Sequence, residues 1–574
     1  MTRYYAITIF LLLSFNLYAQ QWQTPFEQSD GKETTTYFEC IKFYNALDAA
    51  STQVKMVTRD TTDAGYPLHV VLYNNLGNFN IQHFQKRKQL VILVNNGIHP
   101  GEPDGIDASM ILLKNILNKQ IKINDNIILA IIPIYNIGGA LQRNSVTRVS
   151  QDGPLSYGFR GNAQNLDLNR DFIKADSKDA MAFEKIFQWL QPDILIDNHV
   201  SDGADYQHTF TLLTTQHNKL PAPLGNFLHN TFEPALYKSM QEKNWDICPY
   251  VNFEDALPGL GWTCFYDPPR YSSGYAALFS TIAFVPETHM LKPFQERVKS
   301  TYDFMKSLIE VAGINYQTIL EKRILSQSII KDKFFHYNWT IDSTQKDIIS
   351  FKGYDTGMVI SKITGLPRMF YNHKKPFTKN VEYYNYMKPK QQIIKPKFFI
   401  IPAGWHAAIQ RLQWNGVKMK QIKNDSTVVC SYFILDHYDT YKSAYEKHYR
   451  HYNIQYHNEQ DTIAFHKGDF LFYTGQESDL YIMETLIPDT DDSFFSWNFF
   501  DAILQPKEGY SDHRWEEVGG NWLSQNPELK HTLEKKKLTD STFATDMDAQ
   551  LYFVYRNSPW FDPNYLRIPV YFNY

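Results

Sequence analysis

The stretch QLVILVNNGIHPGE (residues 89–102) joins an apolar run to a polar loop. The run Gln89 to Val94 has the character of a strand that is buried on both faces of a sheet. His99 and Glu102 follow in the pattern His-x-x-Glu, in which a tight turn can aim both side chains at one point. Because glycines and a proline shape this loop, the stretch predicts a buried strand that ends in two metal ligands.

The His-x-x-Glu pattern alone is weak evidence, because a chain with 18 His and 61 acidic residues contains it by chance. Two further copies are present, His513 to Glu516 and His531 to Glu534. Both lie in polar stretches with no strand before them, which indicates solvated surface. The buried strand before His99 distinguishes the first copy.

Alternating strands and helices surround this stretch. We expect further strands at residues 68–73, 127–134, 193–197 and 281–286, and helices at residues 106–117, 177–190 and 293–312. The apolar runs have strand length, and the helices show apolar residues at helical spacing, with Ser177 as a cap. This alternation predicts an α/β fold with a mixed central sheet and helices on both of its faces.

The chain of 574 residues is too long for one ordinary core. Its sequence pattern also changes near residue 325, beyond which the segments are short, aromatic and strand-like. We expect a signal peptide at residues 1–19, a catalytic domain at 20–325 and a mostly β accessory region at 326–574. In the accessory region the strand-like segments are 397–401, 427–433 and 469–473, with a helix near 441–449. The aromatic stretch 491–504 is expected to pack against another part of the molecule.

The N-terminus has the features of a secretory signal. Arg3 provides a positive charge, Ala6 to Phe15 is apolar, and Ala19 precedes a cleavage point before Gln20. An N-terminal anchor helix is the alternative, although the apolar run is short for a bilayer span. We therefore expect an exported protein, periplasmic or extracellular, with no transmembrane span after signal removal. The formal net charge of −4 shows no excess of basic residues of the kind that nucleic-acid binding requires.

The four cysteines are too few for a disulfide scaffold and lack the close pairing of a cysteine zinc site. One bridge is plausible in an oxidising compartment, and Cys248 with Cys264 is the nearest pair in sequence.

Three further polar segments complete the candidate site. His199 follows the predicted strand 193–197, and Glu287 follows the strand 281–286. The segment 165–171 (NLDLNRD) is dense in polar residues, and Arg170 in it suits recognition of a carboxylate. The ordinary alternatives are a hydrogen-bonded loop histidine, a salt-bridged rim glutamate and a solvated charged loop. Since a catalytic zinc site needs three protein ligands and an open position, His199 is the expected third ligand.

In this order the segments resemble the zinc carboxypeptidase family, the carboxypeptidase A-type metallopeptidases. The family pattern is His-x-x-Glu, an Asp-x-Asn-Arg segment, a strand-end His and a strand-end Glu, and the resemblance covers about residues 65–315. It implies that His99, Glu102 and His199 bind one Zn²⁺ per chain. Asp167 would orient a metal-bound histidine.

The resemblance also implies roles toward the substrate. Asn169 and Arg170 would bind a terminal carboxylate, Arg160 would polarise the scissile carbonyl, and Glu287 would be the general base and acid. By its distance from Glu287, Tyr266 best matches the family's mobile tyrosine, and Tyr271 and Tyr275 compete for the same position. The family's Asn-Pro-Asp-Gly is replaced by Asn-Ile-Gly-Gly at residues 136–139. We expect the segment 267–275 to line the specificity pocket, and nothing in it matches the acidic residue with which family members select Lys or Arg.

The predicted function is hydrolysis of the C-terminal peptide bond of peptides with a free terminal carboxylate. Water activated by zinc would attack the carbonyl, with Glu287 as the base. One alternative is a zinc amidase or deacylase on the same scaffold, acting on cell-wall or other non-standard amide bonds. A second is a non-catalytic binding protein that retains the fold, against which the complete ligand set and Glu287 argue.

Overall fold

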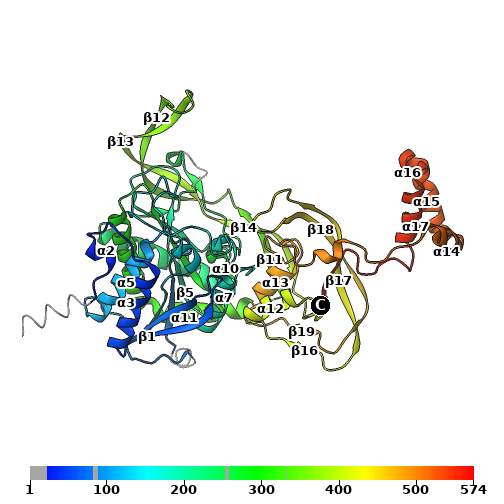
Figure 1. Ribbon diagram of the computed structural model, residues 1–574, viewed down its shortest axis with the longest axis horizontal. Helices are drawn as coiled ribbons and strands as arrows, with labels where there is room; N and C mark the ends of the chain where they lie inside the picture. The colour runs from blue at the N-terminus through cyan, green and yellow to red at the C-terminus, as the bar shows by residue number, and fades with distance from the viewer. Residues whose placement is uncertain (1–21, 82–87, 253–256, 331–332) are drawn as a thin grey trace, which may run out of the picture.

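The computed structural model describes residues 22–81, 88–252, 257–330 and 333–574 (Figure 1). The predicted signal peptide at residues 1–19 lies outside the described residues. No helix within the described ranges is long and apolar enough to cross a membrane.

A mixed nine-stranded sheet forms the centre of the first half of the chain. Eight of its strands follow the order β1-β2-β4-β3-β5-β10-β7-β8, and β6 pairs with β10. The strands are β1 (Val54–Thr61), β2 (Pro67–Asn74), β3 (Leu90–Asn95), β4 (Ile127–Ile132), β5 (Ile194–Asp197), β6 (His199–Ser201), β7 (Phe210–Thr214), β8 (Cys248–Pro249) and β10 (Ile282–His289). The central run β4-β3-β5-β10 is parallel, whereas β1, β2 and β7 join antiparallel neighbours. The predicted mixed sheet and its predicted strands are confirmed.

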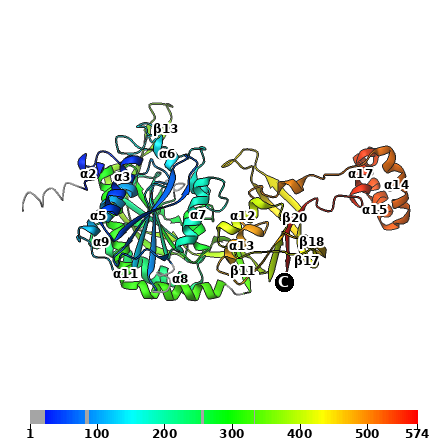
Figure 2. The same ribbon diagram turned by 60° about the horizontal axis from the view of Figure 1, so that its bottom comes forward.

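Helices cover both faces of this sheet, as predicted (Figure 2). They are α2 (Pro25–Gln28), α3 (Tyr37–Ala50), α5 (Asp104–Leu117), α6 (Ile137–Leu141), α7 (Lys178–Leu190), α8 (Ala222–Phe227), α9 (Glu233–Glu242), α10 (Ser272–Ala277) and α11 (Phe294–Ile330). α3, α5, α8, α9 and α11 pack in one core cluster, and α7 and α10 pack in the other. Ser177 caps α7 as predicted, because its side chain accepts a hydrogen bond from the Ala180 N–H.

Helix α11 is longer than expected and runs to Ile330 instead of ending near residue 312. Gly313 does not stop it, and the residues that follow lack proline and continue to bury side chains such as Ile319 and Ile330. The expected division between residues 325 and 326 therefore falls inside this helix. Figure 2 shows α11 along one side of the sheet, extending toward the C-terminal half.

The C-terminal half is rich in strands, as predicted. Its six-stranded sheet has the order β16-β19-β15-β20-β17-β18, while β11 pairs with β14 and β12 with β13. The strands are β11 (Phe334–Ile341), β12 (Asp347–Ile360), β13 (Pro367–Tyr384), β14 (Met387–Ile394), β15 (Phe398–Ile401), β16 (Lys420–Gln421), β17 (Ser426–Thr440), β18 (His451–Phe465), β19 (Phe470–Tyr473) and β20 (Arg567–Asn573). β13 also pairs with β9 (Trp262–Thr263), a strand of the first half.

The aromatic stretch 491–504 packs as expected. Phe494, Phe495 and Phe500 are buried in a cluster that also contains α7, α10 and strands of both the central and the six-stranded sheet. The helices α12 (His406–Trp414) and α13 (Asp479–Leu486) join the same cluster. The two halves of the molecule therefore share this cluster.

Two expectations about the C-terminal half are wrong. Residues 441–449 form no helix, because β17 continues to Thr440 and a turn with Glu446 and Lys447 in the left-handed region leads into β18. Four helices that the sequence analysis did not predict form a separate unit with its own small core, at the far end of Figure 1. They are α14 (Asp512–Gln525), α15 (Pro527–Thr539), α16 (Ser541–Thr545) and α17 (Met547–Arg556).

The four cysteines are all free and buried. The bridge considered between Cys248 and Cys264 is not formed.

Candidate metal centre

The candidate ligands meet where parallel strands of the central sheet end. β3 and β5 pair through Asn95 and Asp197, so the loops that follow them leave the sheet side by side. His99 and Glu102 lie in the first loop, and His199 begins β6 after the second. Polar side chains collect at this edge because the carboxyl ends of parallel strands lie together.

Gly97 makes the first loop feasible. Its φ of 64° is a left-handed conformation that residues with a Cβ rarely adopt. A Cβ at this position would also lie 3.0 Å from the Ile106 side chain. The chain can therefore turn back over α5 and direct His99 toward Glu102.

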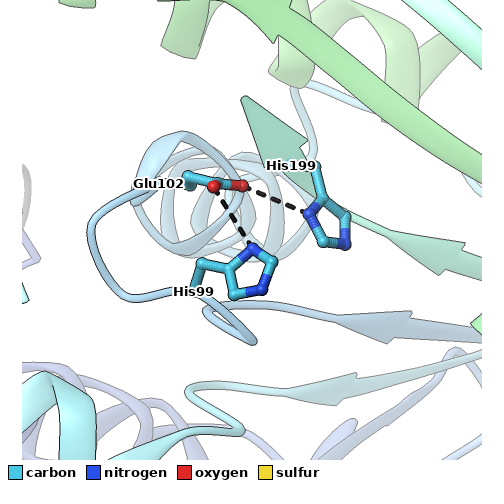
Figure 3. A group of neighbouring side chains, drawn as sticks. All are labelled: His99, Glu102 and His199. Carbon is cyan, nitrogen blue, oxygen red and sulfur yellow. Dashed lines mark hydrogen bonds and ion pairs between the residues drawn. The ribbon is translucent and has the colours of Figure 1, made fainter. Parts of the chain in front are cut away.

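The side chains of His99, Glu102 and His199 converge on one point (Figure 3). Nδ1 of His99 lies 3.2 Å from Oε1 of Glu102, and Nδ1 of His199 lies 3.2 Å from Oε2 of the same carboxylate. One ligand atom from each residue lies within 4.8 Å of the others, and all three side chains are buried. Two imidazoles and a carboxylate are the donor set of many catalytic zinc sites.

The outer nitrogens of both imidazoles contact carboxylates. Nε2 of His99 lies 2.9 Å from Oδ1 of Asp167, and Nε2 of His199 lies 3.1 Å from Oδ2 of Asp197. A proton held at Nε2 leaves the Nδ1 lone pair free to bind a cation. Consistent with this, the buried Nδ1 of His99 has no hydrogen-bond partner among the described residues. The site therefore fits a divalent metal ion.

Charges around the site favour ionised carboxylates. Burial would raise the pKa of Glu102, but Arg148 and His99 hold it well below its usual range. Burial opposes the ionisation of Asp167 too, yet His99 and Arg160 hold its pKa well below the ordinary value. Burial disfavours the charged form of His199, and Asp197 reverses the effect and raises its pKa.

Two arginines flank the carboxylates. Nη2 of Arg148 lies 2.7 Å from Oε1 of Glu102. Arg160, the residue predicted to polarise the carbonyl, bonds Asp167 at 2.8 and 3.0 Å, and its Nη1 lies 3.7 Å from Glu102. Sequence reasoning did not identify Arg148, which lies in a loop without a recognisable motif.

A cavity of about 570 Å³ contains most of the predicted site. It is lined by His99, Glu102, Arg160, Asn169, Arg170, His199, Tyr271 and Glu287. Arg170 stacks over the ring of Tyr271 at 4.4 Å. The buried Oδ1 of Asn169 has no hydrogen-bond partner among the described residues, which makes it available to a ligand.

Glu287 lies beside His199, because these residues are paired in register between β10 and β6. The pKa of Glu287 is raised to about 8, chiefly by burial, with His199 opposing the rise and Glu102 adding to it. Its carboxyl group can therefore hold or release a proton near neutral pH, which a proton-transfer group requires.

The three tyrosines occupy different places. Of these, Tyr271 alone lines the cavity of the candidate metal centre, called the metal cavity below. Tyr266 donates its hydroxyl to Asp491 and lines neighbouring cavities, whereas Tyr275 is fully buried and donates to Asn415 at 2.6 Å. Tyr250, which sequence reasoning missed, also lines the metal cavity.

No family model and no curated protein matches this chain. The chain is similar to solved metallocarboxypeptidases. A metallo-carboxypeptidase from Burkholderia cenocepacia is 16% identical, with a TM-score of 0.35 over 49% of this chain and 70% of the other. One from Pseudomonas aeruginosa, in complex with (2-guanidinoethylmercapto)succinic acid, is 13% identical, with a TM-score of 0.37 over 50% of this chain and 70% of the other. The carboxypeptidase A from Helicoverpa armigera is 13% identical, with a TM-score of 0.36 over 49% and 74%.

Proposed function

We propose that this protein is a zinc-dependent metallocarboxypeptidase that removes the C-terminal residue of peptides. The observation that carries the proposal is the convergence of two Nδ1 atoms and a carboxylate, all buried, beside Glu287 in one cavity. This arrangement unites a three-ligand metal site with a carboxyl group that is suited to proton transfer.

His99, Glu102 and His199 would hold the zinc ion. Bound in this way, zinc makes water acidic enough to act as a nucleophile near neutral pH and polarises a carbonyl group. Asp167 and Asp197 hold the two imidazoles by their outer nitrogens.

Glu287 would take a proton from the attacking water and deliver it to the leaving amine. Arg160 or Arg148 would stabilise the negative charge that develops on the carbonyl oxygen, because both guanidinium groups line the same cavity.

Arg170 and Asn169 define the class of substrate. A carboxylate that enters a partly dry cavity needs a fixed cation, and a guanidinium group supplies one with a planar pair of donors. Arg170 is 21% exposed and stacks on Tyr271 at the cavity wall, so its position is fixed while its charge stays accessible. We therefore expect a peptide with a free C-terminal carboxylate.

The test compares peptides that differ only in a free or amidated C-terminus. Removing one partner of a buried charge pair costs about 2–5 kcal/mol, roughly 30-fold to several-thousand-fold. Arg170→Ala should lower kcat/KM for the free-acid peptide at least about tenfold, and amidation should lower the wild-type value similarly. The two losses should not add, because they remove the same contact.

Arg170→Lys should rescue activity in part, since a lysine keeps the charge but not the planar pair of donors. Arg514→Ala, at an exposed position on α14, is the matched control and should leave kcat/KM unchanged. Equal cleavage of amidated and free-acid peptides by the wild type would contradict carboxypeptidase activity and favour the zinc amidase.

We also propose that the protein is exported. The proposal rests on the positive, apolar and small-residue segments of residues 1–19. N-terminal sequencing of protein from its native host should find Gln20 as the first residue.

A further inference from the structure

A loop of the C-terminal half reaches the candidate metal centre. It is the turn between β17 and β18, residues 441–450. Oε2 of Glu446 accepts a hydrogen bond of 2.9 Å from the backbone N–H of Asp167, a residue 279 positions earlier in the chain. Asp167 in turn bonds Nε2 of His99 through its side chain. Glu446 is therefore two hydrogen bonds away from a candidate metal ligand.

The loop is fixed on the side of the first half. Nε2 of His448 lies 2.6 Å from Oδ2 of Asp176. Lys447 lies 3.8 Å from the same carboxylate, but its side chain is half-exposed and such a pair contributes little. Asp176 is itself held by Lys174 and Arg411, one from each half of the molecule. This charged cluster connects the loop to the segment that carries Asp167 and Asp176.

The loop is also fixed from the C-terminal half. The ring of Tyr445 stacks on Trp497 at 6.2 Å. The side chain of Asn498 donates to the carbonyl of Tyr449 at 2.9 Å, and Arg450 donates to the carbonyl of Asp491 at 2.6 Å. The partners in these contacts belong to the aromatic stretch 491–504. The loop therefore connects this packed stretch to the candidate metal centre.

The loop adopts a backbone conformation that needs such support. Glu446 and Lys447 have φ values of 46° and 71°, in the left-handed region that residues with a Cβ rarely occupy. Residues in this conformation are strained and persist where the surroundings determine them, often at functional sites. The conformation directs Glu446 at the backbone of Asp167.

We propose that Glu446 is a positioning residue for the metal centre, contributed by the C-terminal half. By holding the backbone of Asp167, Glu446 fixes the carboxylate that holds Nε2 of His99 and thus directs Nδ1 at the metal position. The inference rests on the proposed function for its catalytic consequence. It also gives the C-terminal half a role, because the metal centre is completed only when the β17–β18 loop is in place.

Three variants of the full chain test this inference. Glu446→Ala removes the acceptor, Glu446→Gln keeps an oxygen that can accept from the same N–H, and Lys447→Ala alters the neighbouring side chain, which is 51% exposed. Loss of a group that orients a metal ligand typically weakens metal binding about 10–100-fold. Glu446→Ala should therefore weaken zinc binding, measured by competition with a chelator, at least about tenfold, and should lower kcat.

The conservative variants should behave differently. Glu446→Gln should retain most of the zinc affinity and kcat, because the hydrogen bond is retained, and Lys447→Ala should match the wild type. Wild-type zinc affinity in Glu446→Ala, or an equal loss in Glu446→Gln and Glu446→Ala, would overturn the inference.

A measurement on the metal-free protein separates this inference from the proposed function. Hydrogen exchange of peptides that cover residues 165–171 reports on the Asp167 amide directly. Exchange there should be faster in Glu446→Ala than in the wild type and Lys447→Ala, with or without zinc. Unchanged exchange would overturn the inference, whereas a wild type that binds no zinc would contradict only the proposed function.

Discussion

Glu287 and His199 are paired in register on adjacent parallel strands, so the candidate proton-transfer group and a candidate ligand have fixed relative positions. Glu287→Gln preserves shape and removes the ability to transfer a proton. Since general acid–base catalysis contributes about 10²–10⁴-fold, we expect kcat to fall by about that factor. Zinc content and melting temperature should stay at wild-type values, because Glu287 is not among the three converging ligands.

Glu310→Gln is a suitable control, since this glutamate of α11 pairs with Lys243 and does not line the cavity of the candidate metal centre. If Glu287→Gln kept more than half of the wild-type kcat, another group would have to serve as the base.

The residues that the sequence identified most readily are those at the ends of buried strands. His99, His199 and Glu287 each follow an apolar run, and parallel strand ends meet at one edge of a sheet. Arg148 and Tyr250 could not be predicted in this way, because they enter the cavity from loops whose path depends on tertiary packing. The same dependence separates Tyr271, at the cavity, from Tyr266 and Tyr275.

At the scale of elements, the strands of the central sheet were predictable because their apolar runs match strands buried on both faces. The helix expected near residues 441–449 is a turn. Its left-handed residues Glu446 and Lys447 could not be recognised in the sequence, because the usual sign of that conformation is a glycine. The helices α14 to α17 were missed because their mostly polar sequences bury few side chains, such as Trp515 and Leu533.

At the scale of the whole molecule, the N-terminal half and the C-terminal half share a core cluster and a sheet pairing between β9 and β13. The helical unit of α14 to α17 has a separate core. The two ends of this unit lie close together, since the backbone N–H of Lys507 donates a hydrogen bond of 2.9 Å to the side chain of Asp562. We propose that the catalytic domain, expected at residues 20–325, extends to the end of α11 at Ile330 and that the accessory region supports it.

Replacing residues 508–561 with a short Gly/Ser linker should leave zinc content unchanged and kcat/KM within about twofold, because distant sites contribute independently. Chains tolerate such exchanges where the two ends of an insertion lie close together. Metal analysis and peptide hydrolysis of the shortened protein check this. Loss of zinc in a folded shortened protein would show that the helical unit supports the metal centre.

The zinc content of the purified protein, before and after removal of the two imidazoles, tests the assignment of the metal centre most directly. The wild type should contain about one zinc per chain, the stoichiometry expected for a single three-ligand site. The double variant His99→Ala, His199→Ala should contain almost none and should hydrolyse no peptide. A chelator should abolish wild-type activity, and added zinc should restore it. Unchanged zinc content in the double variant would contradict the assignment of His99, Glu102 and His199 as the metal ligands.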